Sequence, residues 1–187
     1  MIRFRSALFL SAPVLALLAA TRPSPCVQDA SAAPGAEHAR LCKLAGDWTV
    51  DTTFVLAPGA KAQQFHGTAH ARAILGGRFV QFDETAVEFG QPVERQKTWG
   101  FNNAAKTFES VWVYTGSTAV MRLTGAAAAD GKSVAGRATF DGEGQEPQQF
   151  TWSTQWIDDD HFVNVLVAPG RGKGTGPTFT AEYTRKK

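Results

Sequence analysis

The 187-residue sequence has only two cysteines, four histidines and one long apolar run. That run, from Ala7 to Ala20, follows Arg3 and Arg5 and is shorter than the roughly 20 apolar residues that a permanent membrane span needs. A basic start followed by a short apolar segment is typical of a secretory signal peptide. We therefore predict a signal peptide and processing region over residues 1–32, an exported protein that is periplasmic or secreted, and no stable membrane span.

The scarcity of cysteine limits how disulfide bonds could hold the fold. Cys26 and Cys42 could close a small loop in an oxidising compartment if Cys26 survives processing. Otherwise Cys42 is a single thiol packed on a short helix. A lipid anchor at Cys26 is the alternative to a released protein, although Pro23 and Pro25 make a poor approach to such a site.

The charge balance argues against two classes of partner. The chain carries 19 basic and 17 acidic residues, but three of the basic residues and Asp29 precede the predicted mature start at Ala33. The mature protein is therefore close to neutral, and neither nucleic acid nor an anionic membrane surface is indicated as a partner. Residues 33–187 are sufficient for a single domain with a substantial core.

The sequence beyond Trp48 lacks helical periodicity, and alternating apolar and polar residues recur between turn signals such as Pro58–Gly59 and Asp130–Gly131. This alternation predicts half-buried strands. Many short strands favour a closed antiparallel up-and-down β-barrel of about ten strands, all-β in class, because closure removes exposed edges. A short capping helix is predicted over residues 36–44, ended by Gly46. The predicted strands cover residues 48–56, 63–74, 78–89, 93–101, 107–115, 118–126, 132–141, 148–157, 161–168 and 178–185.

The interior of this barrel can be inferred from parity, because successive side chains of a strand point to opposite faces. The inward set mixes bulky aromatic residues with Gly and Ala, which favours a ligand-sized cavity. The alternative is a filled core in which small residues accommodate large ones. The predicted lining consists of Phe54, Phe108, Ser110, Trp112, Tyr114, Phe150, Trp152, Thr154, Trp156 and Asn164, with Ser110, Thr154 and Asn164 as polar anchors.

Local motifs for catalysis, metal binding or cofactor binding are missing. His66 and His70 would lie about 13 Å apart along a strand, too far to share one metal ion. Asp158–Asp160 lacks the ligand spacing of a calcium loop, so we interpret it as a solvated turn. Gly76–Gly77 leads into a strand rather than into the helix of a phosphate-binding loop. His161 is a poor haem ligand because it lies at a turn. We expect no catalytic residue, metal or cofactor.

One group of motifs resembles a known family. Gly46-Asp47-Trp48 has the Gly-x-Trp form that opens the first strand of lipocalins and other calycins. In that group the Trp packs across the closed end of the barrel and an Arg of the last strand covers it. The resemblance therefore implies that Trp48 and Arg185 form a structural closure. More specifically, the chain resembles the bacterial calycin-like family called domain of unknown function 1579, which has no established activity. The motifs that carry this likeness are His38, Leu41, Leu44–Trp48, Ile74–Val80, Trp99–Asn102, Ser110–Trp112 and Tyr183–Lys186.

The function expected from these features is the binding of a small apolar molecule inside an exported barrel, rather than catalysis. Two alternatives stay open. An enzyme of isomerase or hydrolase type would place ionisable residues with perturbed pKa values inside the barrel. A structural or envelope-interaction module would combine a filled interior with a large apolar patch outside.

Overall fold

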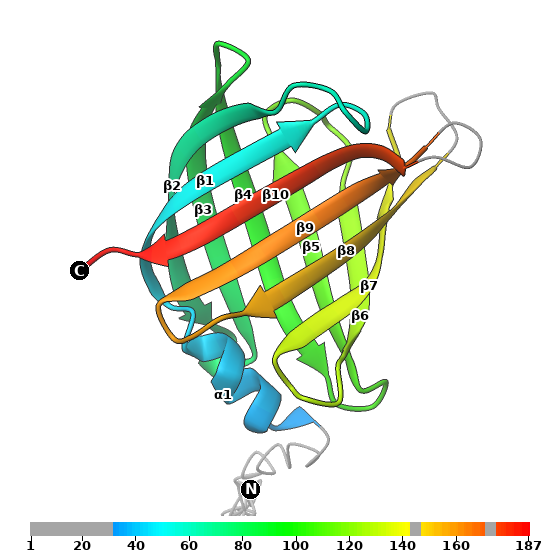
Figure 1. Ribbon diagram of the computed structural model, residues 1–187. Helices are drawn as coiled ribbons and strands as arrows, with labels where there is room; N and C mark the ends of the chain where they lie inside the picture. The colour runs from blue at the N-terminus through cyan, green and yellow to red at the C-terminus, as the bar shows by residue number, and fades with distance from the viewer. Residues whose placement is uncertain (1–31, 143–146, 171–174) are drawn as a thin grey trace, which may run out of the picture.

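The computed structural model describes residues 32–142, 147–170 and 175–187, and it shows a closed antiparallel barrel of ten strands (Figure 1). Each strand pairs with its neighbours in the sequence, and the first pairs with the last. This confirms the predicted fold class. The predicted signal peptide and Cys26 lie outside the described residues. The strands are β1 (Gly46–Val55), β2 (Gln63–Ile74), β3 (Phe79–Glu88), β4 (Gln91–Asn102), β5 (Thr107–Tyr114), β6 (Met121–Ala127), β7 (Ser133–Phe140), β8 (Gln148–Trp156), β9 (His161–Pro169) and β10 (Thr175–Arg185).

The strand limits follow the alternating pattern closely, with two differences that have local causes. Strand β6 begins at Met121 instead of residue 118, because the Ser117 hydroxyl accepts a hydrogen bond from the Ala119 amide and extends the preceding turn. Strand β10 begins at Thr175, earlier than predicted, and its pairing with β9 shifts register between Thr175 and Thr178. Alternation cannot reveal such an irregularity, because an irregular residue breaks the period on which the prediction depends.

The helix α1 (Ala36–Cys42) lies across one end of the barrel (Figure 1). Leu41 is buried against the barrel, and Leu44 continues the apolar contact just beyond the helix. The prediction that Gly46 ends this helix is wrong, because α1 ends at Cys42 and Gly46 is the first residue of β1. Gly46 has a φ of +136°, and a Cβ atom there would lie 2.5 Å from Nη1 of Arg185. The positive φ therefore favours glycine at this position, and the absence of a Cβ leaves room for the Arg185 guanidinium.

The half of the barrel nearest α1 is filled by aromatic side chains. Trp48 meets Phe162 edge to face with ring centroids 5.0 Å apart, and Phe162 stacks on Tyr183 at 4.2 Å. Trp99 and Trp152 form a second edge-to-face pair at 5.6 Å. Such pairs stabilise the core beyond their area burial by roughly 0.5 to 1.5 kcal/mol each. The structure thus has a packed, closed end beneath α1. No helix in the described part of the chain is long and apolar enough to cross a membrane.

Candidate functional site

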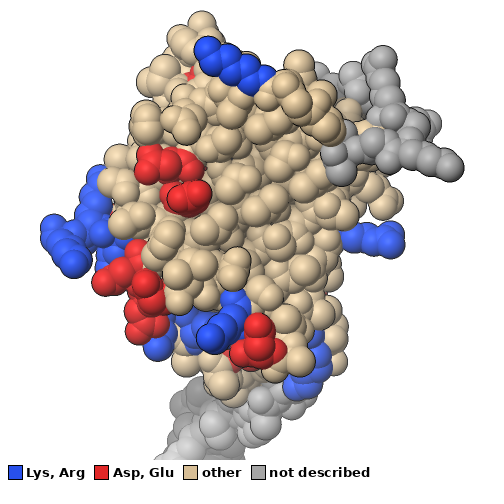
Figure 2. All heavy atoms as spheres, viewed as in Figure 1, with Lys and Arg blue, Asp and Glu red and all other residues tan. Residues whose placement is uncertain are grey.

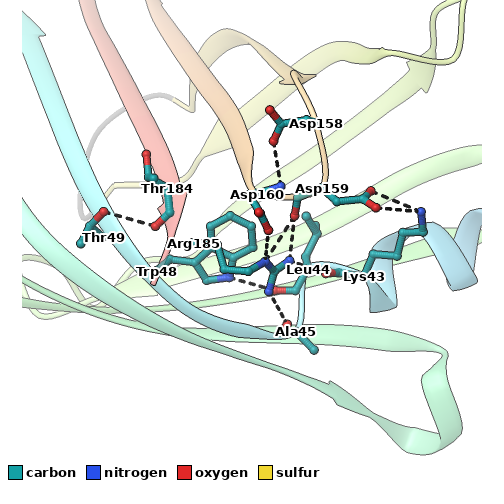
Figure 3. A network of polar contacts seen from close by, with 10 residues as sticks. All are labelled: Lys43, Leu44, Ala45, Trp48, Thr49, Asp158, Asp159, Asp160, Thr184 and Arg185. Carbon is teal, nitrogen blue, oxygen red and sulfur yellow. Dashed lines mark hydrogen bonds and ion pairs between the residues drawn. The ribbon is translucent and has the colours of Figure 1, made fainter. Parts of the chain in front are cut away.

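The end of the barrel beneath α1 is closed by Trp48 and Arg185 (Figure 3). Trp48 is fully buried, and its Nε1 donates a hydrogen bond of 2.9 Å to the Leu44 carbonyl. The guanidinium carbon of Arg185 lies 4.2 Å from the centroid of the Trp48 ring. The two residues are also register partners, so the contact joins β1 to β10. This end is therefore sealed by a cation–π contact between the first and last strands.

The Arg185 guanidinium is held by acceptors from two other segments (Figure 3). It donates to the carbonyls of Lys43 and Ala45 at 2.7 and 2.8 Å, and to the Asp160 carboxylate at 2.9 Å. It also donates to the Asp159 carbonyl at 2.9 Å. The Asp158–Asp160 turn is exposed, and its role in anchoring Arg185 was not predicted from the sequence. With its donors committed in this way, Arg185 has a structural role.

A polar cluster lies inside the barrel, between the closed end and the opposite, open end. Lys97 on β4 forms an ion pair with Glu84 on β3, with 2.8 Å between Nζ and Oε1. Lys97 also donates to the Tyr183 hydroxyl at 2.6 Å, and that hydroxyl donates to Glu84 Oε1 at 2.6 Å. All three side chains are buried. Sequence reasoning missed the cluster, although Glu84 and Lys97 share strand parity with the buried Phe82 and Trp99.

Burial and charge shift the pKa values of two of these groups in opposite directions. Burial raises the pKa of Tyr183 well above its ordinary value, and the adjacent Glu84 carboxylate raises it further. Burial lowers the pKa of Lys97, and the ion pair with Glu84 offsets only part of that effect. Tyr183 therefore keeps its proton, whereas Lys97 loses its proton more readily than an ordinary lysine. Neighbouring groups whose pKa values are shifted apart in this way can act as an acid and a base.

The Tyr183 shift predicts an alkaline titration that can be measured directly. The chain has two tyrosines, so Tyr114→Phe leaves Tyr183 as the only phenol. We expect phenolate absorbance in this variant to appear well above pH 10.0, the ordinary tyrosine pKa, or only on unfolding. Since the folded state holds the proton more tightly, the free energy of unfolding falls as pH rises beyond about 10. Ionisation at or below the ordinary value with intact far-ultraviolet circular dichroism contradicts this assignment.

A second ion pair lies closer to the open end. Arg95 on β4 donates to Glu88 on β3, with 2.5 Å between Nη2 and Oε2. The Glu88 side chain is 7% exposed and that of Arg95 is 21% exposed. Oε1 of Glu88 is buried and has no hydrogen-bond partner among the described residues. A buried acceptor left without a donor costs about 1 to 3 kcal/mol, so this oxygen is a site where a donor would be favourable.

Next to this pair, at the open end of β4 to β7, Arg95, Trp112, Met121 and Phe140 are half buried and Tyr114 is exposed. Arg95 is the register partner of Tyr114, and Met121 is the partner of both Trp112 and Phe140. The rings of Tyr114 and Phe140 lie 6.4 Å apart, beside a pocket of about 540 Å³ bounded by the Thr115–Thr118 turn. We call this surface the open-end recess; it is formed by Arg95, Trp112, Tyr114, Met121 and Phe140.

The opposite wall at the same end is closed by phenylalanines. The rings of Phe54 and Phe179 lie 4.5 Å apart, and Phe89 contacts Phe54 at 5.5 Å and Phe65 at 4.7 Å. Phe89 reaches them from the β3–β4 turn, where its φ of 51° lies in the left-handed region. The open end is therefore asymmetric, with a packed wall on one side and the open-end recess on the other.

The predicted cavity lining is divided among several environments. Trp112 and Tyr114 belong to the open-end recess, and Phe150 is half buried on β8. Phe54, Phe108 and Trp152 are packed in the core. The polar anchors are paired internally, since Ser110 accepts from Trp112 Nε1 at 2.8 Å and Thr154 donates to Asn164 at 2.6 Å. Trp156 lies near the closed end, with the Arg40 guanidinium 4.4 Å above its ring.

The outer surface carries the remaining candidate residues. His66 and His70 are exposed and contact Asp51 and Asp47 at 2.6 and 2.7 Å. Within the described residues, no group of three or more His, Cys, Asp or Glu is arranged to hold a metal ion. A hollow of about 390 Å³ also lies over β3 to β5, where Asp83, Gln96 and Val113 have outward parity. The lining of this hollow also includes Glu84 and Arg95, which have inward parity.

The face formed by β8 to β10 is mostly free of charge, as Figure 2 shows. Its valines, Val163, Val165 and Val167, are half buried between polar neighbours such as Thr180 and Ser153. The face therefore does not present the large apolar patch that would favour a structural or envelope-interaction module.

Comparison with known proteins places the chain in a family. The model of the family described as "Protein of unknown function (DUF1579)" matches residues 33–185, so the chain belongs to this family and the predicted resemblance is confirmed. Among solved structures, the crystal structure of Rv2717c from M. tuberculosis has a similar fold, with a TM-score of 0.58 and 13% sequence identity. The likeness covers 83% of this chain and 100% of that chain, and at this identity it shows the fold alone. No curated protein matches the chain.

Proposed function

We propose that the protein binds a small, largely apolar molecule in the open-end recess. The observation that carries this proposal is the contrast between the two halves of the barrel. Aromatic side chains are packed beneath α1, whereas Trp112, Met121 and Phe140 are only half buried at inward positions, with Trp112 and Met121 packed on one side against the core. The adjoining open pocket of about 540 Å³ shares Tyr114 and Phe140 with the recess, and the rest of its lining is made of polar and small residues of the rim.

We further propose that the protein acts outside the cytoplasm. The support is the N-terminal order of Arg3, Arg5 and the apolar run from Ala7 to Ala20. Fractionation of cells expressing the full chain, followed by mass measurement of the mature protein, tests both export and the alternative of a lipid at Cys26. Retention of an uncleaved chain in the cytoplasm would reject this part of the proposal.

Nile red, a neutral apolar fluorophore, provides a direct test of the recess. We expect Met121→Lys to weaken Nile red binding by about tenfold or more, because it places a charge in the apolar wall. The matched control is Val113→Lys, which adds the same charge on the exposed outer face of the neighbouring strand. Fluorescence titration gives both affinities. Equal weakening by the two substitutions would mean that the recess is not the binding site.

Tryptophan emission adds a second readout of the same site. Trp112 lies in the recess, whereas Trp156 lies near the closed end beneath Arg40. The change in tryptophan emission on ligand binding should be lost in Trp112→Phe and retained in Trp156→Phe. A signal lost in Trp156→Phe instead would place the ligand at the other end of the barrel.

General acid–base catalysis is the second candidate function, and the polar cluster favours it. The lowered pKa of Lys97 makes it the candidate base, and the raised pKa of Tyr183 keeps a proton on the neighbouring phenol. Hydrolysis of p-nitrophenyl butyrate, compared between the parent protein and Tyr183→Phe, tests a hydrolase role. Loss of turnover in Tyr183→Phe with unchanged Nile red binding supports catalysis. If the parent shows no turnover, or if both proteins show the same turnover, the hydrolase role is rejected.

A further inference from the structure

The Arg95–Glu88 pair lies where the apolar recess meets the buried polar cluster. Arg95 is the register partner of Tyr114, and its side chain is partly accessible, whereas Glu88 is buried behind it. A molecule whose apolar body occupies the recess would therefore bring its polar end to Arg95 first. A role for Arg95 in contacting this polar end rests on the proposed ligand-binding function.

The hydrogen-bonding capacity of the pair is incomplete. Glu88 Oε2 accepts from Arg95, but the buried Oε1 has no partner among the described residues. A guanidinium carries five N–H donors, and Glu88 is the partner that the structure shows for Arg95 through Nη2. The pair can thus offer an acceptor and donors at the same time.

The two ion pairs that the described residues form inside the barrel have no net charge. Glu84 and Glu88 supply two formal negative charges, and Lys97 and Arg95 supply two positive charges. Removing an ion from water into this interior without a counter-charge is unfavourable. A carboxylate or an ammonium group would break the balance, whereas a neutral group with both a donor and an acceptor would preserve it.

We propose that the Arg95–Glu88 pair binds the polar end of the ligand and selects a neutral hydroxyl or amide over a charged head group. The donor of the head group would bond Glu88 Oε1, and its oxygen would accept from Arg95. The ligand class is therefore an apolar molecule with a neutral, hydrogen-bonding end, such as an alcohol.

Three probes with the same alkyl chain test this selectivity on the full-length protein. Octanol, octanoate and octylammonium differ only in head group, and near pH 7 the last two are ionised. In displacement of Nile red, we expect octanol to bind at least about tenfold more tightly than either ion. Equal affinities, or an ion that binds more tightly than octanol, would overturn the inference and leave the apolar recess intact.

Charge-changing variants should then reorder the probes. Glu88→Gln leaves one uncompensated positive charge, so octanoate should become the preferred probe. Arg95→Met leaves one negative charge, so octylammonium should become preferred. The control, Glu94→Gln, removes the same charge from the exposed outer face next to Arg95 and should keep the parent order.

The outcomes separate the two levels of the proposal. If Nile red and octanol fail to bind at all, the proposed ligand-binding function itself fails. If they bind but Glu88→Gln and Arg95→Met keep the parent order, the recess stands and the head-group assignment is wrong. Near-ultraviolet circular dichroism identifies a variant that does not fold, and in that case the ranking of the three probes on the parent protein decides the question.

Discussion

Replacement of Trp48 by alanine is expected to lower the free energy of unfolding by about 3 to 5 kcal/mol. The indole is fully buried, contacts Phe162 edge to face and donates a hydrogen bond to the Leu44 carbonyl. Its loss would leave a cavity and remove the ring beneath the Arg185 guanidinium. Urea unfolding at equilibrium, followed by circular dichroism, measures the change.

Two further variants make this result specific to the closed end. Trp48→Phe keeps an aromatic ring but loses the bond to Leu44, so its loss should be smaller than that of Trp48→Ala. Val111→Ala alters an exposed residue on the outer face of β5 and should change stability by less than about 0.5 kcal/mol. A Trp48→Ala protein as stable as the parent would show that the indole does not hold the barrel closed.

The second large effect is expected at the buried ion pair. Lys97→Met should destabilise the protein by about 3 to 5 kcal/mol, because it leaves the Glu84 carboxylate buried without its counter-charge. The double variant Lys97→Met with Glu84→Gln removes both charges and should recover a large part of that loss. Urea unfolding of the single and double variants provides the comparison.

An exposed ion pair offers a matched control for this substitution. Lys43 and Asp159 lie 3.2 Å apart, but their side chains are 64% and 78% exposed. Lys43→Met should therefore cost no more than about 1 kcal/mol. If the double variant at Lys97 and Glu84 is no more stable than the single variant, the unpaired charge is not the source of the loss.

The barrel was predictable because it depends on strand parity, which the sequence records directly. The closure by Trp48 and Arg185 was implied by the resemblance to lipocalins, and parity is consistent with it. Trp48 and Arg185 occupy inward positions of strands that must pair when the barrel closes, and the structure brings them into contact. The polar cluster left a weaker signal. Glu84 and Glu88 on β3, and Arg95 and Lys97 on β4, are charged residues at inward positions, and this pattern could have been interpreted as two buried ion pairs.

The open-end recess could not be predicted from sequence in the same way. Parity identifies Phe54 and Trp112 as inward, but it does not say that Phe54 packs with Phe89 and Phe179 while Trp112 stays half exposed. That difference depends on how side chains meet across the barrel and on the backbone of the β3–β4 turn. The role of Asp160 as an acceptor for Arg185 likewise requires the three-dimensional structure, because the two residues belong to different elements.

Pairing of β1 with β10 also has a kinetic consequence. The ladder between them joins residues that are distant in the sequence, such as Thr49 and Thr184, which lie 135 positions apart in the chain. Contacts of such large sequence separation slow folding, because a long loop must close before they form. Until then β1 and β10 would each expose an unpaired edge open to intermolecular association. The Trp48–Arg185 contact forms when β1 pairs with β10, and this pairing removes both exposed edges. The refolding yield at high protein concentration should therefore depend on this contact.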